Sequence, residues 1–288
     1  MRYQNSEEMV NGLRTSYIER GEGPLMVMLH GIAATKECWH HAIDRFEGEY
    51  RIIAPDLPGH GATDAPFTIY SLHYLSAWLH DFLSGLDARP ATLLGNSLGG
   101  ALALRYAFDY PEQVQRLVLV NPLGLSEHNP WRVATHFVSR FGNAVSFIVT
   151  GAHDQAMRYL DDWVVRDPWD ENARGALEYM MDQTHAKGLW PMWVGLNTLT
   201  SDFTTPAQRH HWLNEASQLR IPTLVVWGEH DRLLPSQDGL AGAKAHLPHA
   251  KTHIFHNSAH VPMLEEPAAF NLVLNDFLQE HPLPGNLL

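Results

Sequence analysis

Short apolar runs alternate along much of this chain with stretches whose apolar residues recur every three or four positions. The short runs have the length of buried β-strands, and the other stretches have the spacing of amphipathic helices, clearest over residues 72–86 and 267–280. This alternation predicts an α/β fold with a mostly parallel sheet and helices on both of its faces. The predicted strands span residues 15–20, 25–29, 51–54, 91–94, 117–120, 223–227 and 252–255.

The alternation breaks between Gly124 and about Pro206, where the pattern is helical and aromatic without a clear strand. We interpret this stretch as a lid inserted after the strand that ends near Asn121. The predicted domains are therefore a core formed by residues 1–123 and 207–288 and a helical cap formed by residues 124–206. Such a lid excludes water and shapes an apolar pocket.

The composition is that of an ordinary enzyme, and it disfavours nucleic acid and membranes as binding partners. The formal net charge of the 288 residues is −12, which disfavours non-specific binding to nucleic acid. No stretch approaches the ~18 apolar residues of a membrane span, and residues 1–10 lack the apolar core of a secretory signal. The single cysteine, Cys38, permits no intrachain disulfide and is compatible with a reducing compartment. We expect a cytoplasmic protein.

A serine stands between a predicted strand and a predicted helix in the segment Gly95-Asn96-Ser97-Leu98-Gly99. A serine on such a turn is typical of a nucleophile, and the glycines fit because side chains there would collide with neighbouring backbone. The N–H of Leu98 has no intrahelical partner in the first helical turn, so together with the helix dipole it can bind an oxyanion. We expect Ser97 to be the nucleophile and Leu98 an oxyanion-hole donor.

A serine nucleophile needs a histidine base and usually a carboxylate that orients the histidine. Asp231 follows the predicted strand 223–227, and His260 lies in a loop after the strand 252–255. Loops at the carboxyl ends of parallel strands hold the sites of open α/β sheets. The order Ser97, Asp231, His260 along the chain is that of one architecture of serine hydrolases.

Other residues compete for these two roles. Glu229 is the alternative acid, while His253 and His256 are alternative bases that lie in or at the end of a predicted strand. A loop histidine reaches over the edge of the sheet more readily, which favours His260. A second possible position for the acid, after the strand 117–120, holds Asn121, and this favours Asp231.

With these features the chain resembles enzymes of the α/β-hydrolase fold over nearly its whole length. The resemblance implies a mostly parallel central sheet of about eight strands, helices on both faces and a helical lid inserted after the sixth strand. It also implies that the second oxyanion donor is the backbone N–H of Ile32. The matching segments are Leu29-His30-Gly31, Asp56 to Gly61, Gly95 to Gly100, Trp227 to Asp231, and Ser258 to Pro262.

No cofactor or metal is expected for this chemistry. Gly59-His60-Gly61 resembles part of a dinucleotide fingerprint but lacks the third glycine, so we interpret it as a turn. His253, His256 and His260 fall on a strand and a loop without cysteine partners, which disfavours a metal site.

The sequence thus predicts acyl transfer to water, with a small apolar ester or acyl compound as substrate. Trp163, Trp190, Trp193 and Val261 are the predicted pocket residues. Carbon–carbon bond hydrolases of ring-cleavage diketones are the alternative, since Gly95-Asn96-Ser97 and Trp227-Gly228 are similar to theirs. Those enzymes usually have tryptophan where this chain has Val261, so an esterase comes first. A cofactor-free acyltransferase or perhydrolase and a non-catalytic small-molecule receptor remain open, whereas Ser97 disfavours relatives with an aspartate nucleophile.

Overall fold

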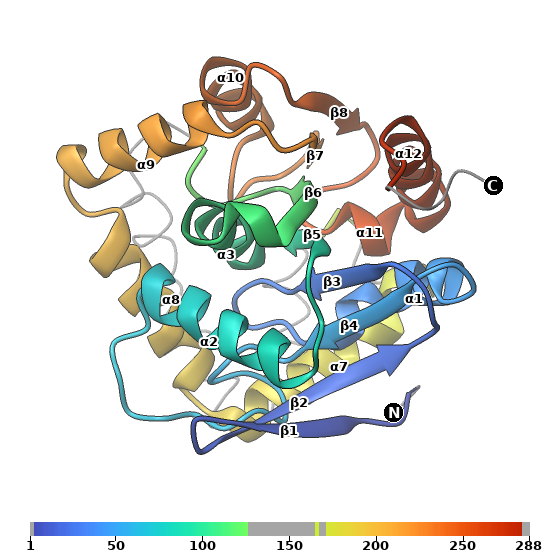
Figure 1. The fold of residues 1–288 in the computed structure, drawn as a ribbon, viewed down its shortest axis with the longest axis vertical. Helices are drawn as coiled ribbons and strands as arrows, with labels where there is room; N and C mark the ends of the chain where they lie inside the picture. The colour runs from blue at the N-terminus through green and yellow to red at the C-terminus, as the bar shows by residue number, and fades with distance from the viewer. Residues whose placement is uncertain (1–2, 126–164, 167–170, 284–288) are drawn as a thin grey trace.

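A computed structural model describes residues 3–125, 165–166 and 171–283 of the chain. Its centre is an eight-stranded sheet with the strand order β1-β2-β4-β3-β5-β6-β7-β8 (Figure 1). β2 runs antiparallel to both β1 and β4, and every other neighbouring pair is parallel. The strands are β1 (Ser6–Val10), β2 (Leu13–Arg20), β3 (Leu25–Leu29), β4 (Arg51–Pro55), β5 (Ala91–Asn96), β6 (Val114–Val120), β7 (Thr223–Gly228) and β8 (Lys251–Phe255).

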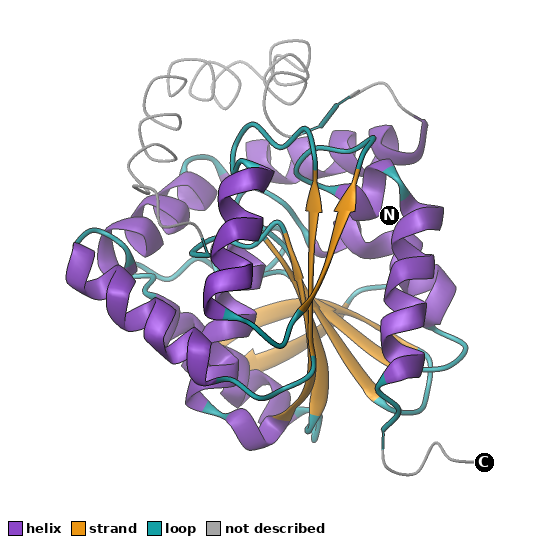
Figure 2. Cartoon of the chain, turned by 90° about the horizontal axis from the view of Figure 1, so that it is seen from above, coloured by secondary structure: helices purple, strands orange, loops and turns teal. Residues whose placement is uncertain are grey.

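Helices cover both faces of this sheet (Figure 2). α2, α3 and α10 pack on one face together with α9, whereas α1, α11 and α12 pack on the other together with α7. The helices are α1 (His40–Phe46), α2 (Leu72–Gly85), α3 (Leu98–Asp109), α7 (Glu171–Lys187), α8 (Trp190–Asp202), α9 (Pro206–Gln218), α10 (Ser236–His246), α11 (Pro262–Glu265) and α12 (Pro267–Glu280), with 3-10 turns η1 (Lys36–Trp39) and η2 (Pro111–Gln113). The predicted architecture is confirmed.

The central strands are apolar because both of their faces are buried. All five residues of β3 are buried. Val27 and Leu29 point into the core shared with α2 and α3, while Met26 and Met28 point into the core shared with α1 and α12. Successive side chains of a strand face opposite sides, so a parallel strand covered on both faces reads as a continuous apolar run.

One strand, β1, was not predicted from the sequence. β1 is an edge strand whose side chains alternate between partly buried and exposed until the buried Val10, and it contains Glu7 and Glu8. It pairs with β2 through the two-residue turn Asn11-Gly12, in which both residues have positive φ, 52° and 80°. Asn-Gly is the sequence most typical of such a hairpin turn, so the signal was present.

The helical stretch after the sixth strand is only partly described. In the described part of residues 124–206 the regular elements are α7 and α8, with α9 beginning at the end of this stretch. The division into residues 1–123 with 207–288 and residues 124–206 stays a prediction. In the portion of the chain that could be searched, no helix has both the length and the apolar character needed to cross a membrane.

Candidate active site

Ser97 sits on the sharp turn between β5 and α3 with φ 54° and ψ −114°, a conformation that L-residues rarely adopt. The glycines around it have no room for a side chain. A Cβ atom on Gly95 would lie 2.2 Å from the carbonyl oxygen of Gly99, and one on Gly99 would lie 2.2 Å from that of Leu29. The Ser97 hydroxyl makes no capping hydrogen bond with α3, and Leu98 is the first residue of that helix.

The turn that carries Ile32 abuts this serine. The N–H of Ala34 donates to the carbonyl of Gly31 at 3.3 Å, and Ala33 between them has φ 56°. A Cβ atom on Gly31 would lie 3.1 Å from the Cβ of Ser97, so glycine allows the two turns to approach. The backbone of Ile32 and the N-terminus of α3 therefore border the same serine.

α7 and α8 pack over the turn of Ile32. The hydroxyl of Thr184 in α7 donates to the carbonyl of Ala33 at 3.1 Å. Gly195 in α8 faces the side chain of Ile32, since a Cβ atom there would lie 2.8 Å from Ile32 Cδ1. These helices supply a partly apolar cover to the turn that carries Ile32.

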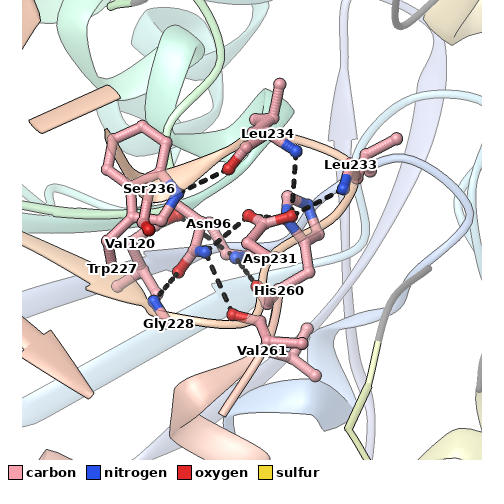
Figure 3. Close-up of polar contacts among 12 residues, drawn as sticks. Asn96, Val120, Trp227, Gly228, Asp231, Leu233, Leu234, Ser236, His260 and Val261 are labelled. Atoms are coloured by element: carbon pink, nitrogen blue, oxygen red, sulfur yellow. Dashed lines mark hydrogen bonds and ion pairs between the residues drawn. The ribbon is translucent and has the colours of Figure 1, made fainter. Parts of the chain in front are cut away.

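Asp231 and His260 are in direct contact after β7 and β8 (Figure 3). His260 Nδ1 lies 2.7 Å from Asp231 Oδ2, and both side chains are almost fully buried. Asp231 Oδ1 accepts the N–H groups of Leu233 at 2.9 Å and Leu234 at 2.8 Å. An ionised carboxylate only accepts, so we assign the proton to Nδ1 of His260, which leaves Nε2 free to accept a proton.

Two asparagines join this pair to the central strands. Asn121 Nδ2 donates to Asp231 Oδ2 at 2.6 Å and to the carbonyl of Ala259 at 3.1 Å. Asn96, next to Ser97, donates from Nδ2 to the carbonyl of His260 at 3.0 Å. The sequence singled out position 121 only as a place for an alternative acid, so its bond to Asp231 was missed. The position of Asn121, directly after a predicted central strand, was the sequence signal that could have pointed to this contact.

The competing residues lie elsewhere. Glu229 Oε2 is 2.8 Å from Nδ1 of His256, and both side chains are exposed. His253 belongs to β8, where its ring contacts that of Phe255 with 4.6 Å between centroids. The contact with a buried carboxylate therefore distinguishes His260 from the other two histidines of this segment.

A buried ion pair anchors the segment after the turn that carries Ile32. Lys36 Nζ lies 2.5 Å from Asp56 Oδ2, and both side chains have at most 1% exposure. The other carboxylate oxygen accepts the backbone N–H of Lys36 at 3.0 Å. His30, which precedes the turn, accepts the N–H of Leu57 at Nε2, at 2.9 Å. Burial lowers the pKa of His30 to about 4, so this ring is neutral and structural.

The predicted pocket residues are only partly placed. Trp193 is 41% exposed and stacks on Phe67 with 6.3 Å between ring centroids, while Trp190 contacts the same ring edge-on at 6.4 Å. Val261 is buried directly after His260. Trp163 lies outside the described residues. Across the ranges that the structure describes, no group of three or more His, Cys, Asp or Glu side chains is arranged to hold a metal ion.

Comparison with known proteins places this geometry in a family. Residues 26–271 match the model of the "Alpha/beta hydrolase family". A 2-hydroxy-6-oxononadienedioate/2-hydroxy-6-oxononatrienedioate hydrolase from Paraburkholderia phymatum is 30% identical over 284 residues, covering 96% of this chain and 95% of the relative.

Solved structures agree on the fold. An enol-lactonase from Burkholderia xenovorans superposes with a TM-score of 0.79 at 21% identity, covering 95% of this chain and 100% of that one. An esterase from Exiguobacterium antarcticum gives a TM-score of 0.76 at 19% identity, covering 96% and 100%. The chain therefore belongs to the alpha/beta hydrolase family.

Proposed function

We propose that this chain is a serine hydrolase that cleaves carboxylic esters of small to medium apolar substrates through an acyl-enzyme on Ser97. The observation that carries the proposal is the buried 2.7 Å contact between His260 Nδ1 and Asp231. It is joined through the bond from Asn96 to the carbonyl of His260 to the strained strand-to-helix turn of Ser97. Hydrolases of this family act with such a combination of nucleophile, base and orienting acid.

The mechanism follows from the proton on Nδ1. The free Nε2 of His260 takes the hydroxyl proton of Ser97 as the oxygen attacks the ester carbonyl, and Asp231 stabilises the imidazolium that forms. The backbone N–H groups of Ile32 and Leu98 bind the oxyanion, whose charge develops only in the transition state. His260 then gives its proton to the leaving alcohol. Water repeats the sequence on the acyl-enzyme and frees Ser97.

The apolar substrate class is supported by the surroundings of the oxyanion turn. Ile32 faces α8, and Val261 is the buried neighbour of the base. Pockets with apolar walls and a few fixed polar groups favour apolar ligands oriented by one polar centre. Nucleic acid and cofactors have no part in this proposal, and a cytoplasmic location stays a prediction that cell fractionation tests.

A panel of p-nitrophenyl esters of short and medium acyl chains tests the proposal, together with a serine-directed fluorophosphonate probe. We expect turnover of the apolar esters by the wild-type protein, and loss of both turnover and labelling in Ser97→Ala. Ser84→Ala, which changes a serine of α2, is the matched control and keeps both. Labelling retained by Ser97→Ala would assign the nucleophile to another residue.

Carbon–carbon bond hydrolysis is the second candidate, supported by the relative from Paraburkholderia phymatum. The same panel includes a vinylogous 1,5-diketone, whose cleavage without ester turnover would favour this alternative. Alcohol or peroxide acceptors added to the ester assay detect acyl transfer away from water. Binding of such compounds without turnover or labelling would instead favour a non-catalytic receptor.

A further inference from the structure

The turn that carries His260 lies between β8 and α11 and has no regular secondary structure. Buried backbone groups outside helices and strands need other partners, because an unsatisfied group costs about as much as a lost hydrogen bond. Two carbonyl groups of this turn accept hydrogen bonds from side chains. Asn121 donates to the carbonyl of Ala259 and Asn96 to that of His260.

Two N–H groups of the same turn are held by one carboxylate, that of Glu265. Glu265 Oε2 accepts the N–H of Ala259 at 2.9 Å and that of Val261 at 3.3 Å, the residues on either side of His260. Its second oxygen, Oε1, accepts the backbone N–H of Arg166 at 2.6 Å. One side chain thus spans the histidine turn and the segment 165–166, which belongs to the stretch inserted after β6.

The same segment is attached to this turn at a second point. The guanidinium of Arg166 donates from Nη1 to Asn257 Oδ1 at 3.0 Å, three residues before His260. Asn257 also donates its backbone N–H to Glu266 Oε2 at 3.0 Å. The bonds of Glu265 differ from these contacts because they hold the N–H groups of the two residues next to His260, Ala259 and Val261.

Glu265 is itself in an environment that disfavours its charge. The pKa of its carboxyl is raised to about 7, chiefly by burial and also by the nearby charge of Asp231, although the N–H bonds from Arg166, Ala259 and Val261 lower it. A protonated carboxyl turns one of its acceptor positions into a donor, which cannot bind an N–H group. The three N–H contacts of Glu265 therefore use both oxygens of its ionised carboxylate.

We propose that Glu265 is a positioning residue for His260, which holds the imidazole in line with Asp231 by binding the peptide N–H groups on both sides of it. The inference rests on the proposed function for its effect on catalysis. The alternative is that Glu265 only closes the first turn of α11, because Val261 is the N-cap residue of that short helix.

The two roles separate in Glu265→Met, which keeps most of the length and volume of the side chain but has no oxygen in place of Oε2, the atom that accepts both N–H groups of the turn. A displacement of about 1 Å in a catalytic group costs on the order of 100-fold in rate. At pH 8 we expect kcat for a p-nitrophenyl ester to fall by about 10- to 100-fold while KM changes by less than about threefold, because Glu265 does not contact the substrate. Glu266→Gln removes the same charge from the next residue and is the matched control, expected to stay within about twofold.

A readout that does not depend on turnover is the downfield proton NMR signal of His260 Nδ1–H, identified by its absence in Asp231→Ala. We expect this signal in the wild type and its loss or broadening in folded Glu265→Met. Unchanged kcat and an unchanged signal in the folded variant would overturn the proposal. If the wild type cleaves no ester, the NMR result still decides the role of Glu265 while the proposed function fails separately. Glu265→Asp, which keeps the charge but is too short to bind both the turn and the N–H of Arg166, replaces the Met variant if that variant does not fold.

Discussion

Asn121 binds the same oxygen of Asp231 that contacts the imidazole of His260. Asn121→Asp would replace a donor 2.6 Å away by a second carboxyl group, and two carboxylates at this distance cannot both ionise easily. At low pH the pair shares a proton, which takes the place of the amide N–H. As pH rises that proton is lost, and repulsion pushes the carboxylates apart.

For this variant we therefore expect kcat/KM relative to the wild type to be highest near pH 6 and to fall by about tenfold or more toward pH 9. The measurement is the ratio of the two pH profiles with one neutral ester. Asn121→Ala removes the donor without adding a charge, so its ratio should stay flat. A flat ratio for Asn121→Asp as well would show that Asn121 does not act through the charge of Asp231.

A second prediction concerns how Glu265 changes the stability of the protein with pH. Its folded-state pKa of about 7 lies above the ordinary value of 4.5, so the stability contributed by its neutral form is present below about pH 4.5 and is lost as pH rises through about 7. Glu265→Gln removes this loss. We therefore expect the free energy of unfolding of the variant, measured relative to that of the wild type, to rise by about 3 kcal/mol between pH 4.5 and 8.

Urea unfolding of both proteins at several pH values measures this difference. Glu266→Gln, as above, reports the effect of losing one negative charge from the same segment. Parallel pH dependences of wild type and Glu265→Gln would show that the carboxyl group of Glu265 titrates in the folded protein as it does in the unfolded chain.

The candidate nucleophile, acid and base could be chosen from sequence because each follows a predicted strand and belongs to a short motif. The roles of Asn121 and Glu265 could not. Asn121 contacts Asp231 across 110 positions of the chain, and no local pattern encodes which carboxylate an asparagine will reach. Glu265 is close to His260 in sequence, but its significance depends on how a short irregular turn folds back on itself.

At the scale of elements, the turn between β5 and α3 stores strain at Ser97, whose φ is 54°. Such a conformation costs a non-glycine residue about 1–3 kcal/mol, and glycine avoids most of this cost. Ser97→Gly and Ser97→Ala both remove the hydroxyl, so their difference isolates the backbone. We expect the glycine variant to be the more stable by about 1 kcal/mol, measured by urea unfolding. Equal stabilities would mean that the turn relaxes when the serine is replaced.

The segment between β3 and α1 depends on the buried pair of Lys36 and Asp56. Lys36→Met leaves the carboxylate buried without its counter-charge, and removing one partner of such a pair costs about 3–5 kcal/mol. The double variant Lys36→Met/Asp56→Asn leaves no buried charge at this position and keeps one acceptor oxygen for a neighbouring backbone N–H group. We expect it to be more stable than the single variant Lys36→Met in urea unfolding. If the double variant loses as much free energy of unfolding as Lys36→Met and Asp56→Asn lose separately when added together, the two side chains do not stabilise each other.

Elements with a buried apolar pattern could be predicted from the sequence, often to within one or two residues. β3 spans Leu25–Leu29 and α12 spans Pro267–Glu280, as predicted. β1 was missed because an edge strand with an alternating, acidic sequence has little apolar signal, although its Asn11-Gly12 turn marks the hairpin. β5 and β6 extend beyond their predicted ends because polar residues such as Asn96 and Arg116 continue the hydrogen-bonded ladder.

At the scale of the molecule, strand order explains why distant motifs meet. β3, β5, β6, β7 and β8 are consecutive neighbours in the sheet and all run parallel. Their carboxyl ends are followed by Ile32, Ser97, Asn121, Asp231 and His260 respectively, so one edge of the sheet collects every residue assigned to the site. The sequence predicted the parallel strands and hence this meeting place. The detailed contacts with α7 and α8 depend on packing between elements that no periodic pattern specifies.

The net charge of −12 is also a property of the whole molecule, and it predicts how the charge of a substrate affects its capture. A negative field lowers the local concentration of anionic compounds, and salt screens that field within about 10 Å at 0.1 M. We expect kcat/KM for mono-p-nitrophenyl succinate to rise with added NaCl, while that for neutral p-nitrophenyl butyrate stays constant. A fall with salt for the anionic ester would contradict this expectation. It would also reveal a local positive group that recruits carboxylates, which is what cleavage of a dicarboxylate diketone requires.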